Sequence, residues 1–121
     1  MKDGKAKIAF IIIAGMAALL FIGCGNELPD DKANYAGEWR TRGRLLRISP
    51  EGRVHYYKGS SKLKAPLQKW KGDDFQVGLL FMNTTFKVSK PPYQDGGTWK
   101  MVVDGKTYKR VKGPDEVTDL D

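Results

Sequence analysis

Hydrophobic and polar residues alternate with a period of two through most of the stretch 35–112, and no helical repeat is found after Gly23. The alternation predicts short strands at 37–42, 44–49, 53–58, 65–71, 74–80, 84–89, 98–103 and 106–111. Turn-forming glycine, proline or aspartate residues separate most of these runs. The sequence therefore predicts an all-β domain, a small antiparallel up-and-down meander of about seven or eight strands that curls into a barrel or clam.

Two turns are specific enough to predict the register of the strands around them. The turn at 50–52 contains proline and glycine, and the Asp-Gly dipeptide at 104–105 is typical of a type I′ hairpin. Residues that face each other across these turns share one side of the sheet. The apolar side chains expected on the buried side are Leu46, Ile48, Val54 and Tyr56 in the first hairpin, and Trp99, Met101, Val103 and Tyr108 in the second.

The N-terminal residues differ from the rest of the chain. Residues 1–7 carry three lysines and one aspartate, residues 8–22 form an uncharged apolar run, and Gly23 follows. A basic start, an apolar helical centre and a small residue at the cleavage position are typical of a secretory signal peptide, here residues 1–23. The alternative is a permanent transmembrane anchor, which needs about 20 apolar residues, more than this run offers.

The sequence LFIGC at 20–24 resembles the lipobox of bacterial lipoproteins, in which a small residue precedes a cysteine. The resemblance implies that signal peptidase II cuts after Gly23 and that Cys24, carrying a diacylglyceryl thioether, begins the mature chain as a lipid anchor. Phe21 stands where that family usually has leucine. Cys24 is the only cysteine, so it has no disulfide partner within the chain. Gly25 stands where an aspartate would retain a lipoprotein at the inner membrane, so the resemblance favours the periplasmic face of the outer membrane in a Gram-negative host.

The mature chain divides by composition into three parts. Residues 24–34 are polar and predict a flexible tether, residues 35–112 predict the barrel-like domain, and the acidic residues 113–121 predict a disordered tail. The domain contains 17 basic and 6 acidic residues, a difference of +11. Basic residues beside aromatic ones are also found where single-stranded nucleic acid binds, but export argues against that partner. Anionic lipids, lipopolysaccharide phosphates and acidic glycans remain.

Four arginines in one short span are candidates for contacting such a partner. They are Arg40, Arg42, Arg44 and Arg47. Guanidinium groups bind phosphate and carboxylate bidentately, and we expect the first three to line one outward stripe on adjacent strands. The alternative is that these charges only keep the outer face of the sheet soluble and discourage sheet-to-sheet association.

The tripeptide Gly-Glu-Trp at 37–39 resembles the G-x-W motif on the first strand of lipocalins and related calycins. The resemblance implies that a basic residue near the last strand, here Arg110, packs over Trp39. The longer stretch 35–59 looks like small bacterial lipoproteins of unassigned function. A lipocalin-like carrier would enclose a small apolar ligand, and its contacts would be Trp39, Trp99, Met101 and Tyr108, which otherwise form an ordinary core.

The remaining polar candidates are isolated residues. His55, the only histidine, is expected on the outward face, and Asp73 and Asp74 are expected to form a turn. Tyr93 is expected to be displayed on a proline-stiffened recognition loop at 90–97, with a plain hairpin connection as the alternative. We expect no enzymatic activity, no cofactor and no metal. The sequence favours a non-enzymatic envelope lipoprotein whose basic face contacts an anionic envelope component or a protein partner; a ligand carrier and an inhibitor or immunity protein are the alternatives.

Overall fold

The computed structural model describes residues 27–79, 82–118 and 120. The predicted signal peptide, with its expected cleavage residue Gly23, and the predicted lipidation residue Cys24 lie outside the described residues. In the described ranges, two short 3-10 helices, η2 (Asp30–Tyr35) and η3 (Pro114–Glu116), flank nine strands. The strands are β1 (Gly37–Thr41), β2 (Arg44–Ile48), β3 (Arg53–Lys58), β4 (Ser61–Lys71), β5 (Asp74–Leu79), β6 (Met82–Phe86), β7 (Val88–Asp95), β8 (Thr98–Val103) and β9 (Lys106–Lys112). No helix in this part of the chain is long and apolar enough to cross a bilayer.

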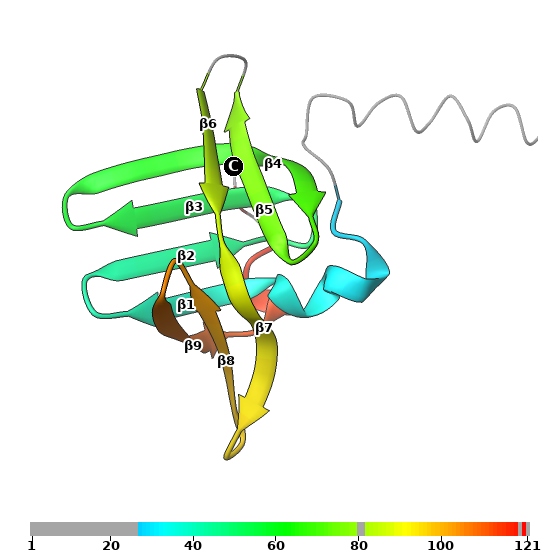
Figure 1. Cartoon of the computed structure of the whole chain (residues 1–121), viewed down its shortest axis with the longest axis vertical. Helices are drawn as coiled ribbons and strands as arrows, with labels where there is room; N and C mark the ends of the chain where they lie inside the picture. The colour runs from blue at the N-terminus through cyan, green and yellow to red at the C-terminus, as the bar shows by residue number, and fades with distance from the viewer. Residues whose placement is uncertain (1–26, 80–81, 119, 121) are drawn as a thin grey trace, which may run out of the picture.

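The described strands form one antiparallel sheet in the order β6-β5-β4-β3-β2-β1-β9-β8-β7. The strands β5, β6 and β7 cross in front of β1 to β4, so the sheet curls into a barrel-like shell (Figure 1). The two edges of the sheet are β6 and β7, although only Lys87 separates them along the chain. One bent run of chain therefore supplies both edges. The predicted all-β meander is confirmed, with β9 returning to pair beside β1.

The predicted registers of both hairpins are confirmed. Ile48 pairs with Val54, and Met101 pairs with Tyr108. The Asp-Gly dipeptide at 104–105 has positive φ at both residues, +49° and +77°, as a type I′ turn requires. The side chains predicted to share the inner face are buried in one continuous core, except that Tyr56 and Trp99 are partly buried against it.

The described residues contain nine strands, one more than the seven or eight predicted, because the predicted strand at 84–89 is divided. Its residues belong to β6 and β7, and the chain bends between them at Lys87. Each half pairs with a different neighbour, β6 with β5 and β7 with β8. A period-two pattern is unchanged by such a bend, so alternation alone does not reveal it.

The expectation that 90–97 forms a displayed loop is wrong. Most of it belongs to β7, where Tyr93 is partly buried and pairs with Lys100 of β8. Two consecutive prolines are tolerated because β7 is an edge strand and because its register shifts between Lys90 and Tyr93. The glycines at 96–97 are left as the turn.

The segment before β1 is packed against the domain rather than extended from it. In η2, Tyr35 is buried, its carbonyl oxygen accepts a hydrogen bond of 2.9 Å from Trp39 Nε1, and its hydroxyl donates one of 2.9 Å to the carbonyl oxygen of Asp73. Leu28 also packs on the core. The expectation of a flexible tether at 24–34 is therefore wrong from Leu28 onward, because burial of these apolar groups fixes the chain.

The acidic segment 113–121 also differs from expectation. Pro114–Glu116 form η3, which lies against β1, and Val117 is only 3% exposed. The carboxylate of Glu116 accepts a hydrogen bond of 3.0 Å from the backbone N–H of Gly113. The expected disorder is therefore not found for the described residues 113–118, since one buried valine holds this segment on the sheet.

The hairpin of β5 and β6 depends on a glycine. Gly78 has φ of +156° and pairs with Asn83, and a Cβ atom at this position would overlap the carbonyl oxygen of Met82. We expect Gly78→Ala to lower the free energy of unfolding by about 2 kcal/mol in a denaturant titration. Gly72→Ala is the control, because Gly72 has φ of +63° but no atom within 4 Å of a Cβ, and should cost only about 1 kcal/mol. Equal losses would contradict the steric argument.

Candidate functional site

The four candidate arginines do not form one stripe. Arg40 and Arg47 lie on the outer face of the sheet, where both contact Glu38. Arg44 pairs with Thr41 and therefore shares the inner face with Trp39, and Arg42 lies exposed in the two-residue turn. The predicted stripe of Arg40, Arg42 and Arg44 is wrong, because the hairpin register places the first and third of them on opposite faces.

Glu38 organises the outer-face arginines. Its side chain is 1% exposed, and its carboxylate oxygens lie 2.8 Å from Arg47 Nε, 2.9 Å from Arg40 Nε and 4.0 Å from Lys112 Nζ. Burial alone would raise the pKa of the Glu38 carboxyl, but the hydrogen bonds and charges of Arg47 and Arg40 outweigh it and hold the pKa below its ordinary value. The Gly-Glu-Trp tripeptide alone did not predict that Glu38 would hold the two arginines.

Arg44 closes a polar cluster at the mouth of the barrel. Its Nη1 donates a hydrogen bond of 3.3 Å to the Tyr56 hydroxyl. Burial, followed by the neighbouring Tyr56 hydroxyl, raises the pKa of the Tyr108 phenol well above its ordinary value. Tyr108 therefore stays neutral at physiological pH, and Arg44 keeps its positive charge.

A shallow depression with a volume of about 360 Å³ lies beside these groups. We call it the basic groove, and its lining residues are Arg40, Thr41, Gly43, Arg44, Leu45, Tyr57 and Gly59. It forms where the turns after β1 and β3 meet, and the N–H of Gly59 donates a hydrogen bond of 3.1 Å to the Gly43 carbonyl oxygen. The groove therefore combines guanidinium groups with one aromatic ring on a hydrogen-bonded pair of turns.

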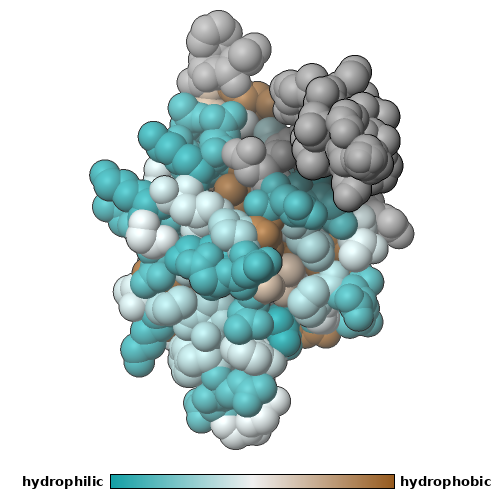
Figure 2. Space-filling view, turned by 90° about the vertical axis from the view of Figure 1, so that its right-hand side faces the viewer, coloured by the Kyte–Doolittle hydropathy of each residue, from teal (hydrophilic) through white to brown (hydrophobic). Residues whose placement is uncertain are grey.

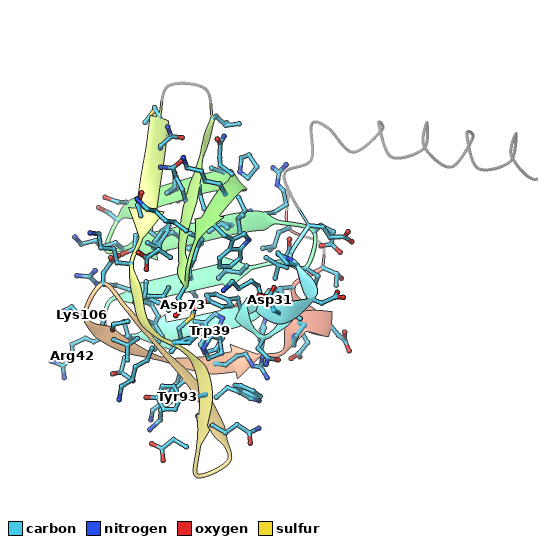
Figure 3. The ribbon with its side chains drawn as sticks, turned by 45° about the vertical axis from the view of Figure 1, so that its right-hand side comes forward. Asp31, Trp39, Arg42, Asp73, Tyr93 and Lys106 are labelled. Carbon is cyan, nitrogen blue, oxygen red and sulfur yellow. The ribbon has the colours of Figure 1, made fainter. Side chains whose placement is uncertain are left out.

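Further basic residues surround the groove. Arg42 lies in the turn next to it, Lys58 pairs with Arg44, and Lys62 pairs with Tyr57. Figure 3 shows Arg42 and Lys106 together at one end of the domain and Asp31 at the other. In the described part of the chain, no ion pair with a carboxylate is formed by Arg42, Lys58, Lys62 or Lys106. Their charge is therefore available at the surface.

The residues considered for an apolar ligand belong to the core. Trp39 and Met101 are fully buried and Tyr108 is 2% exposed, while Trp99 is partly buried and packs against this core. The predicted packing of Arg110 is confirmed, since its guanidinium carbon lies 5.7 Å from the Trp39 ring centre and 4.9 Å from that of Trp99. The distances are those of cation–π contacts.

The glycine of the Gly-Glu-Trp tripeptide has a steric cause. A Cβ atom at Gly37 would lie 2.6 Å from the carbonyl oxygen of Lys112 and 2.7 Å from Cδ of Arg110. Only glycine lets β9 approach β1 closely enough for Arg110 to reach Trp39. Burial in this position lowers the pKa of the Arg110 guanidinium, which nevertheless remains charged.

The isolated polar candidates are structural. Asp74 accepts a hydrogen bond of 2.7 Å from the N–H of Val88, and Asp73 lies 3.4 Å from Lys32 Nζ at the turn. His55 lies on the outward face as expected, paired across the strands with Arg47 and Lys64, but it is only 4% exposed rather than open to water. Among the described residues, no three acidic, histidine or cysteine side chains are grouped as a metal site requires.

No protein-family model, curated protein or solved structure matches the chain.

Proposed function

We propose that this chain is an exported, lipid-anchored, non-enzymatic binding module whose basic groove holds an anionic group of an envelope component. One observation carries the binding proposal. Arg40 and Arg44 line a groove of about 360 Å³ together with Tyr57. Arg40 is held by Glu38, whereas the surrounding Arg42, Lys58 and Lys62 have no carboxylate partner among the described residues. Guanidinium groups bind phosphate and carboxylate oxygens with two parallel hydrogen bonds.

The neighbouring groups support this proposal. Glu38 fixes Arg40 and Arg47 through their Nε atoms, so these side chains lose little conformational entropy on binding. The guanidinium carbon of Arg47 lies 5.9 Å from the Tyr57 ring centre, which orients that ring beside the groove. The groove thus offers positive charge and an aromatic wall, which suits a phosphorylated or carboxylated sugar better than an isolated ion.

The anchoring part of the proposal rests on the signal peptide and lipobox-like sequence ending at Cys24. A thioether-linked diacylglycerol would bind a membrane stably, because each buried methylene contributes about 0.8 kcal/mol and two chains act together. The proposed location is the cell envelope, at the periplasmic face of the outer membrane in a Gram-negative host.

The carrier alternative has less support. A carrier needs a cavity inside the barrel, yet the side chains that would line it, Trp39, Met101 and Tyr108, pack against each other and their neighbours in the core. A domain of this size also needs those side chains for its stability. The open depression lies at the surface, beside charged residues, and suits a polar ligand.

The groove can be tested with heparin as a soluble polyanionic probe. We expect the double variant Arg42→Gln, Arg44→Gln to weaken heparin binding about thirtyfold in a calorimetric titration, since each of the two lost charge-assisted contacts costs about 1 kcal/mol. The control is Lys64→Gln, Lys90→Gln, which removes the same charge from β4 and β7, outside the groove, and should weaken binding about twofold or less. An equal loss in both variants would show that net charge, and not the groove, binds the anion.

A further inference from the structure

The hairpin of β5 and β6 is unlike the rest of the domain in composition. Residues 75–86 contain no charged side chain, although 29% of the chain is charged. Leu79 and Met82, which pair across the end of this hairpin, are 57% and 74% exposed. Exposed apolar side chains of this size cost free energy in water. We call Leu79 and Met82 the apolar tip.

The apolar tip is held away from the barrel by the sheet. The carbonyl oxygen of Gly78 accepts a hydrogen bond of 2.6 Å from Gln68 Nε2, which fixes the hairpin just before the tip. Figure 1 shows the ends of β5 and β6 extending beyond β4, and Figure 2 shows hydrophobic surface at this end of a largely hydrophilic face. A packing role inside the domain is therefore excluded for these two side chains.

We propose that the apolar tip inserts into the lipid bilayer that holds Cys24, an inference that rests on the lipid anchor proposed above. Leu28 is fixed to the domain, since its N–H donates a hydrogen bond of 3.1 Å to the Pro50 carbonyl oxygen and its side chain packs on the core. Cys24 is four residues before Leu28, and four residues span at most about 14 Å. A lipid on Cys24 therefore holds the domain against the bilayer surface.

Charge favours the bilayer over a second copy of the chain. The domain has 17 basic and 6 acidic residues, so two copies repel each other, whereas an anionic leaflet attracts both. Lys69 pairs with Gln76 and Lys71 with Asp74, so these lysines lie along β5 toward the end opposite the tip, and the attraction to an anionic leaflet comes from the charge of the whole domain. An uncharged, exposed apolar tip on a strongly basic domain matches the combination of apolar insertion and electrostatic attraction by which interfacial segments bind membranes.

The test uses the full chain, processed in a bacterial host and reconstituted into vesicles of phosphatidylglycerol and phosphatidylcholine. Cys24 is the only cysteine, so once it is lipidated a single engineered thiol takes an environment-sensitive fluorophore. We compare Met82→Cys with Val111→Cys, because Val111 is an exposed apolar residue (52%) on β9, far along the sheet from β5 and β6. We expect blue-shifted emission at position 82 and several-fold stronger quenching by brominated lipids than at position 111.

Each other outcome overturns the inference. Equal quenching at both positions would show that the tip stays in water. A blue shift at position 82 that appears without vesicles and grows with protein concentration would show that a second copy covers the tip. Intact mass and labelling of the unsubstituted chain test the anchor separately, because only an unlipidated Cys24 takes up the fluorophore. If Cys24 proves to be unlipidated, the Met82→Cys experiment is repeated in a Cys24→Ser background with added vesicles. Fluorophore emission that does not change when vesicles are added would again contradict insertion of the tip.

Discussion

Replacing Trp39 with alanine is expected to lower the free energy of unfolding by about 4 kcal/mol. Trp39 is fully buried, donates a hydrogen bond of 2.9 Å to the Tyr35 carbonyl oxygen, and receives Arg110 over its ring. The substitution therefore leaves a cavity and also releases η2 and β9. Because small domains are stable by only about 5–15 kcal/mol, a large share of the chains should be unfolded at moderate denaturant concentration. Urea titration of the mature protein, followed by circular dichroism, measures the loss.

Trp39→Phe is the informative control. It keeps most of the buried ring but removes the indole N–H, so we expect a loss of about 2 kcal/mol. Equal losses in the two variants would mean that the hydrogen bond to Tyr35, and not the packing of the ring, holds this end of the barrel.

The second large effect is expected for Glu38→Gln, about 3 kcal/mol at neutral pH, because it removes the charge that Arg40 and Arg47 share. The effect depends on pH. The fold lowers the pKa of Glu38, so its contribution is complete above the pKa of an unfolded glutamate, about 4.3, and disappears as the pH falls through the lower folded-state value. The free energies of unfolding of the two proteins should therefore converge in acid. A difference that stays constant down to pH 2 would contradict this assignment.

Local sequence patterns were sufficient to predict the hairpins. Alternation placed Ile48 opposite Val54, and the Asp-Gly turn placed Met101 opposite Tyr108. Both predictions use residues within a few positions of a turn, where backbone geometry determines which side chains meet. The same reasoning would have placed Arg44 on the inner face had the turn after β1 been treated as two residues long.

The outer face could not be predicted in the same way. Burial of Glu38 and His55 on that face departs from the rule that charged and polar side chains point to water. For Glu38 on β1, it coincides with a C-terminal segment that packs against β1 through η3. The sequence of that segment is acidic, and Val117, which is buried, is one of two apolar residues in it. Contacts between distant parts of a chain leave no periodic pattern in either of them.

The pairing of β1 with β9 also affects when the protein can fold. Trp39 pairs with Arg110, so the first strand of the domain completes the sheet with the last. Such long-range pairing slows folding and exposes apolar strand edges until the final residues are present. During synthesis, the growing chain must therefore reach Lys106–Lys112 before Trp39 is covered. Chains truncated before β9 should leave the core exposed and be cut readily by proteases.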